Sequence, residues 1–83
     1  MYKLYHIKLK GTGCCYCVFA TRFIIINAYA DSSYLLMKFY LDDLCVSMIE
    51  PNEVEYVSYF TDIFYNEVYS YKSVPFPEVG EYE

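Results

Sequence analysis

The chain has 83 residues, which suffices for one small domain but leaves little room for a large catalytic cleft. Hydrophobic residues make up 57% of it and aromatic residues 22%, a composition that excludes a disordered acidic tail and requires a packed core. The net charge is −5, and after Lys38 a single lysine faces ten carboxylates, so the sequence favours a basic protein partner over nucleic acid as a direct ligand.

The first thirty residues predict strands. Residues Tyr2 to Lys10 alternate in polarity, with Tyr5, Ile7 and Leu9 on one face. The next segment, 11–13, has the sequence Gly-Thr-Gly and predicts a hairpin loop, because glycine accepts positive φ. Residues 14–20 then form the return strand, and residues 23–30 either continue it past a bend or form a third strand.

A helix is predicted over residues 32–45. The sequence Asp-Ser-Ser at residues 31–33 offers side chains that can cap the first turn of a helix. From there Met37, Leu41, Leu44 and Met48 recur at spacings of four, three and four residues, which lays one apolar stripe along a helix.

A hairpin is predicted over residues 46–60, with a turn at residues 50–53 and a strand at residues 54–60 that pairs back on residues 45–50. Residues 61–83 predict either a strand or a short helix, followed by an extended tail with two prolines. Together these elements predict one α+β domain over residues 1–83, in which a small antiparallel sheet of four or five strands carries one main α-helix on one face.

The cysteines allow three interpretations. Small buried hydrophobic side chains are the first, and we favour it. The second starts from Gly13-Cys14-Cys15-Tyr16-Cys17, which resembles the active-site segment of glutaredoxins; the resemblance implies a thiol redox protein in which Cys14 is the nucleophile and Cys17 the resolving thiol. The third is a metal site made of His6, Cys14, Cys17 and Cys45. We expect neither a cofactor nor a metal.

The acidic second half predicts a partner-binding surface, because carboxylates interleaved with tyrosine supply both charge and apolar anchors. The candidate partner-binding residues are Glu53, Glu55, Tyr56, Tyr59, Asp62, Tyr65, Glu67, Tyr69 and Tyr71. The favoured function is therefore a non-enzymatic interaction module that binds a basic protein. A metal-stabilised or self-associating structural module, possible as a homodimer, is an alternative.

The order of predicted elements and the bias towards Tyr, Ile, Phe and Asn resemble small accessory proteins encoded by bacteriophages. The resemblance implies an inhibitor of a host or defence protein that handles nucleic acid, as anti-CRISPR proteins are. Because no signal peptide and no apolar run of about 20 residues is found, we expect a cytoplasmic protein with no membrane partner.

Overall fold

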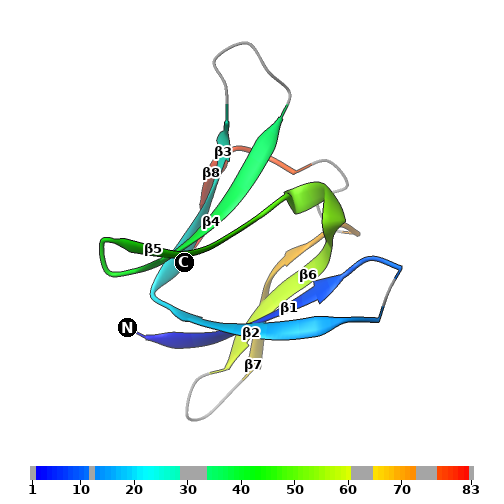
Figure 1. Ribbon diagram of the computed structural model, residues 1–83. Coiled ribbons are helices and arrows are strands. Elements are labelled where there is room, and N and C mark those ends of the chain that lie inside the picture. Colours follow the sequence, from blue (N-terminus) through cyan, green and yellow to red (C-terminus); the bar gives the residue numbers. More distant parts are fainter. Residues whose placement is uncertain (1, 12, 29–33, 61–64, 73–76, 83) are drawn as a thin grey trace.

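The computed structural model describes residues 2–11, 13–28, 34–60, 65–72 and 77–82. These residues form two antiparallel sheets of four strands each (Figure 1). Sheet A has the strand order β2-β1-β6-β7, and its strands are β1 (Lys3–Leu9), β2 (Cys15–Ala20), β6 (Val54–Phe60) and β7 (Tyr65–Ser70). Sheet B has the order β5-β4-β3-β8, and its strands are β3 (Arg22–Asn27), β4 (Leu35–Leu41), β5 (Leu44–Ile49) and β8 (Gly80–Tyr82).

The first hairpin confirms the strands predicted over residues 2–10 and 14–20, and β3 covers the described part of the strand predicted over residues 23–30, of which residues 29 and 30 lie outside the described residues. β2 pairs antiparallel with β1, and the two glycines of the intervening loop, Gly11 and Gly13, have φ of 73° and 71°. β3 is a separate strand and does not continue β2, because the chain passes from sheet A to sheet B at Thr21 (Figure 1). The Thr21 amide and hydroxyl both donate to the carbonyl oxygen of Tyr40, at 2.7 and 3.0 Å, which fixes this corner.

The predicted helix over residues 32–45 is wrong, and the α+β fold with it. Residues 32 and 33 lie outside the described part of the chain, and the residues after them form β4 and β5. The helical element within the described residues is one turn of 3-10 helix, η1 (Pro51–Glu53). No helix in the described ranges is long and apolar enough to span a membrane.

The helix prediction failed because the apolar residues of segment 35–49 fit both the period of a helix and the alternation of a strand. Met37 and Phe39, two residues apart, are both fully buried, as alternation in a strand requires. The helical stripe that begins at Met37 fails further along, because Leu44 and Met48 are 65% and 61% exposed. β4 and β5 are joined by the two-residue turn Asp42-Asp43, where Asp42 adopts the left-handed φ of 57°.

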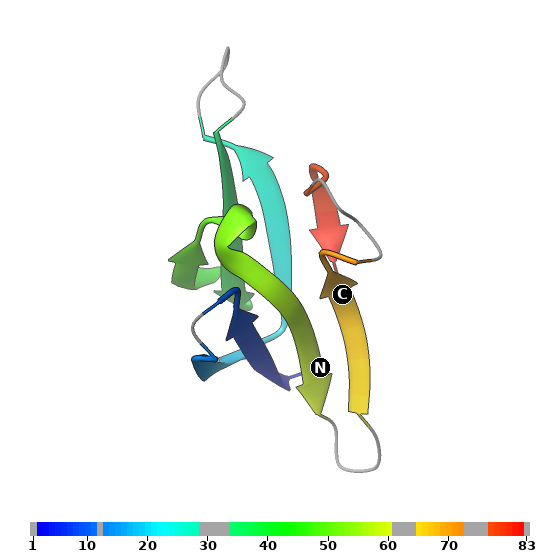
Figure 2. The same cartoon turned by 90° about the vertical axis from the view of Figure 1, so that its right-hand side faces the viewer.

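The predicted hairpin over residues 46–60 is also wrong in its pairing. β6 is a strand, but it pairs with β1 and β7 in sheet A and not with β5 in sheet B. η1 reorients the chain between the two sheets, as Figure 2 shows, and Val57 and Tyr59 then lie opposite Ile7 and Tyr5 of β1. Burial of these four side chains stabilises the long-range pairing.

The core lies between the sheets and is rich in aromatic rings. Tyr5 of sheet A contacts Phe23 and Phe39 of sheet B edge to face, with ring centroids 5.7 and 5.3 Å apart. The other buried hydrophobic residues are Ile7, Val18, Ala20, Ile25, Met37, Val54, Val57, Tyr59 and Tyr69. The two strands after residue 61 complete the fold: β7 is an edge strand of sheet A, and β8 pairs with β3.

Candidate interaction surface on the outer face of sheet A

The strand register of sheet A aligns three large apolar side chains on its outer face. Leu4 of β1 lies opposite Phe19 of β2 and opposite Phe60 of β6. Because Tyr5 between Leu4 and His6 is buried, alternation places Leu4, Phe19 and Phe60 on the side of the sheet away from the core. They are 42%, 55% and 43% exposed, and we call them the apolar row.

Tyr2 extends the apolar row at its β2 end. Its ring stacks on Phe19 with centroids 5.6 Å apart, and it is itself 55% exposed. The Tyr2 hydroxyl donates to Oδ2 of Asp42 at 3.1 Å, which ties the row to the turn between β4 and β5. This hydrogen bond to the Asp42 carboxylate, followed by charge repulsion, raises the pKa of Tyr2.

The next row towards the centre of the face contains Cys17, His6, Ser58 and Glu67. The His6 ring contacts Phe60 edge to face at 5.7 Å, so the imidazole packs against the apolar row. Ser58 is fully buried, and among the described residues no partner lies within hydrogen-bond distance of its hydroxyl. Glu67 is exposed on the edge strand β7 and places one carboxylate beside this row.

The third row contains Cys15, Lys8 and Tyr56. β6 has a bulge here, since the register passes from Val54 to Tyr56 against consecutive residues of β1. Glu55, the extra residue, reaches Lys8 with Oε2 3.1 Å from Nζ. The hydrogen bond to Glu55 raises the pKa of Lys8, and the pair neutralises the lysine on this face.

The structure brings together only part of the predicted partner-binding set. Glu55, Tyr56 and Glu67 share the outer face of sheet A. Tyr59 and Tyr69 are 9% and 3% exposed and belong to the core, so neither is available to a partner.

The remaining four predicted residues lie apart from that face or are not described there. Glu53 is exposed in η1. Tyr71 follows β7 and its ring is 5.1 Å from Nζ of Lys10. Asp62 lies outside the described residues, and Tyr65 is placed by its backbone pairing with Phe60 alone.

The dithiol and metal sites that the sequence left open as alternatives are not assembled among the described residues. Cys14 precedes β2 and Cys17 lies within it, so neither is at a helix start of the kind that glutaredoxins use. Cys45 lies in β5 of the other sheet. Among the residues that the structure places, no three His, Cys, Asp or Glu side chains could hold a metal ion together. All four cysteines are exposed and none forms a disulfide, which contradicts the interpretation of them as buried hydrophobes.

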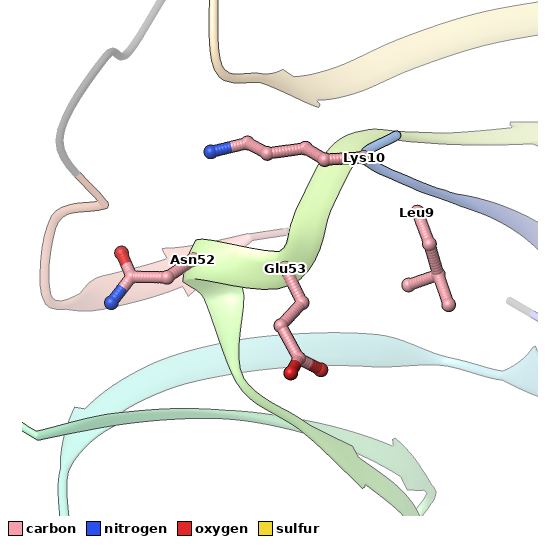
Figure 3. Close-up of a pocket in the computed structure, with 4 residues that line it drawn as sticks. All are labelled: Leu9, Lys10, Asn52 and Glu53. Atoms are coloured by element: carbon pink, nitrogen blue, oxygen red, sulfur yellow. The ribbon is translucent and has the colours of Figure 1, made fainter. Parts of the chain in front are cut away.

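A pocket of about 480 Å³ lies where the end of β1 meets η1 (Figure 3). Leu9, Lys10, Asn52 and Glu53 line it. The Lys10 amide donates to the Glu53 carbonyl oxygen at 2.9 Å, which joins the two segments, and Figure 3 shows the Lys10 and Glu53 side chains pointing in different directions. Among the described residues, this lining supplies one ammonium group, one amide and one carboxylate.

The apolar row was not predicted from the sequence, although the outward direction of two of its side chains follows from the alternation in β1. Once Tyr5 and Ile7 are assigned to the core, Tyr2 and Leu4 must face outward. Comparison with known proteins adds no constraint, since no family model, no curated protein and no solved structure matches the chain.

Proposed function

We propose that the protein is a non-enzymatic interaction module that binds a basic protein through the outer face of sheet A. The observation that carries this proposal is the apolar row: Phe19, Leu4 and Phe60 are aligned across three strands and about half exposed. Aromatic side chains grouped on one face are the residue types that dominate binding energy at protein interfaces.

Charge supports a basic partner. The chain has a net charge of −5, Glu67 lies in the row beside the apolar row, and Asp42 lies at its Tyr2 end. Among the described residues of the three rows, Lys8 is the one lysine and is paired with Glu55, so these rows offer no cluster of unpaired cations to phosphate groups. Lysine and arginine around an apolar pocket are the complementary chemistry.

The predicted order of elements no longer supports the resemblance to phage-encoded accessory proteins, because the helix it included is absent from the described residues. The bias towards Tyr, Ile, Phe and Asn remains, and on that basis the proposed partner is a host or defence protein that handles nucleic acid in the host cytoplasm. On this proposal the module occupies a basic surface of that protein and thereby inhibits it. The acidic, tyrosine-rich second half of the chain contributes Glu55, Tyr56 and Glu67 to this surface. The apolar anchors are Leu4 and Phe19 from the first half of the chain and Phe60 from the second half.

The test is affinity capture from lysate with matched variants. Phe19→Ala combined with Phe60→Ala should weaken binding of the basic partner by on the order of several hundredfold, because anchors of an interface cost about 2 kcal/mol each when truncated. Leu44→Ala combined with Met48→Ala is the control, since it removes two apolar side chains of sheet B that are 65% and 61% exposed. Equal loss in both double variants, or no loss in the first, would contradict the proposal.

Salt provides a second measurement. If Glu67 faces basic groups of the partner, Glu67→Gln should weaken binding at low salt and make the affinity less dependent on salt. Glu78→Gln, at an exposed position after β7, is the matched control that should leave the salt dependence unchanged.

Self-association is a second candidate function, and the observation behind it is the edge strand β5. Its six residues, Leu44–Ile49, carry no charge, and four of the six are exposed. An uncharged edge strand presents backbone donors and acceptors that a second copy can pair with. Light scattering over a range of concentrations should show a dimer that Val46→Lys dissociates; a monomer at every concentration would dismiss this candidate.

A further inference from the structure

The outer face of sheet A also holds a thiol in contact with an imidazole. The Sγ atom of Cys15 lies 3.5 Å from Nδ1 of His6 and 4.0 Å from Nε2. Both residues are fixed by the register of the first hairpin, in which Cys15 lies opposite Lys8 and His6 lies opposite Cys17. The contact therefore joins neighbouring positions of one sheet face and needs no loop to form it.

The imidazole is held in place from the other side. Phe60 of β6 contacts the His6 ring edge to face, with an angle of 84° between the planes. Ser58, opposite His6 in the register, has a buried hydroxyl without a hydrogen-bond partner within the described part of the chain. The thiol of Cys15 and the imidazole of His6 thus lie side by side on neighbouring strands, which is the pairing of a nucleophile with a base that activates a cysteine.

We propose that Cys15 is a reactive thiol that undergoes exchange with small-molecule disulfides, with His6 as its proton acceptor. The Cys15 thiol gives its proton to the imidazole, and the sulfur attacks one sulfur atom of the disulfide. A bond forms between Sγ and that sulfur while the disulfide bond breaks. The departing thiolate takes the bonding electron pair and then the proton from His6, so Cys15 is oxidised and half of the disulfide is reduced.

The product should persist as a mixed disulfide. Cys17 is two residues along the same extended strand, so its Cα lies about 6.6 Å from that of Cys15, near the upper limit of what a disulfide spans. Resolution by Cys17 would therefore distort β2. This separates the proposed site from the dithiol exchange implied by the glutaredoxin resemblance: Cys15 accepts a group and does not pass it on.

Cys45 serves as the internal standard against which the reaction rate of Cys15 is compared. Cys45 donates from Sγ to the carbonyl oxygen of Ser47 in its own strand, at 3.6 Å. It is exposed like Cys15 but lies on the other sheet. If exposure alone governed reactivity, these two cysteines would react at similar rates; if the imidazole contact governs it, Cys15 reacts first.

The experiment treats the full chain with limiting glutathione disulfide and maps the modified cysteines by mass spectrometry over time. Cys15 should react faster than Cys45 by on the order of tenfold, less than a buried general base provides because this pair is exposed. His6→Phe, which keeps the ring packing on Phe60, should abolish the advantage of Cys15 without changing the Cys45 rate. Cys17→Ser should leave the Cys15 rate unchanged.

Two outcomes would overturn the proposal. One is equal rates at Cys15 and Cys45 in the unmodified sequence, which needs no variant at all. The other is a fast Cys15 in His6→Phe that retains the thermal transition of the parent; if that variant does not fold, His6→Gln is measured in its place. The reaction is followed on the isolated protein, so its failure or success is independent of whether the proposed basic partner exists.

Discussion

The rings of Phe23 and Tyr82 lie face to face, with centroids 4.8 Å apart and planes 3° apart. Phe23 is the second residue of β3, and it lies opposite Tyr82 of the three-residue strand β8 in the register. Tyr69 of sheet A contacts the edge of the Tyr82 ring at 6.2 Å. The Tyr82 side chain therefore packs β8, an edge strand of sheet B, against both its neighbour β3 and sheet A.

Tyr82→Ala should lower the free energy of unfolding by about 2 kcal/mol, because it removes a half-buried ring from a stack on a fully buried one. Tyr82→Phe keeps the stack and loses only the hydroxyl donation to the Glu78 carbonyl oxygen, so it should cost about 0.5 kcal/mol. Urea denaturation of both variants measures this. Equal costs would show that the stack contributes little.

Phe39→Ala should cost about 3 to 5 kcal/mol, since Phe39 is fully buried and contacts the rings of Tyr5 and Phe23. Leu44→Ala should change the stability by no more than about 0.5 kcal/mol, because that side chain is 65% exposed. A helix over residues 32–45 would require the opposite, with Leu44 in the buried stripe. Thermal denaturation of the two variants decides between strand and helix.

In a Tyr2→Phe background, which already lacks the hydrogen bond to the Asp42 carboxylate, Asp42→Val should destabilise the fold by about 1 to 2 kcal/mol, because Asp42 has φ of 57° and a β-branched side chain is strained in that region. Asp43→Val, the neighbouring residue of the same turn, is the control and should cost less, since its φ is not positive. The Asp42 amide donates to the Thr21 hydroxyl at 3.1 Å in either case. Similar losses in the two variants would dismiss backbone strain as the cause.

Stability should fall as the pH rises above about 10. Burial raises the pKa of Tyr69, Tyr82 and Tyr16 above the ordinary value of 10.0, so these phenols ionise in the unfolded chain before they do in the folded one. Their contribution is complete below pH 10 and is lost at higher pH. Tyr69→Phe should therefore lose less stability than the parent between pH 8 and pH 11, as urea titrations at the two values would measure.

Some of the candidate site was within reach of sequence reasoning. The alternation that sends Tyr5 and Ile7 inward also sends Leu4, His6 and Lys8 outward, and a hairpin at the two glycines brings β2 beside them. Phe60 was not accessible in this way, because its place beside Leu4 depends on pairing between strands 56 residues apart in the chain. The alternation of polar and apolar residues within a strand does not indicate which distant strand it pairs with.

The sequence by itself determined where strands lie in the first thirty residues, the positive φ of the glycine loop, the need for a dense aromatic core and the acidic charge of the second half. The tertiary structure decided the rest. Residues 35–49 satisfy a helical and a strand period at once, and only the opportunity to bury Met37 and Phe39 against sheet A selects the strand. The same long-range pairing sent Tyr59 and Tyr69 into the core and aligned Phe19, Leu4 and Phe60 outside it, because the face on which a side chain emerges depends on the partner strand and its register.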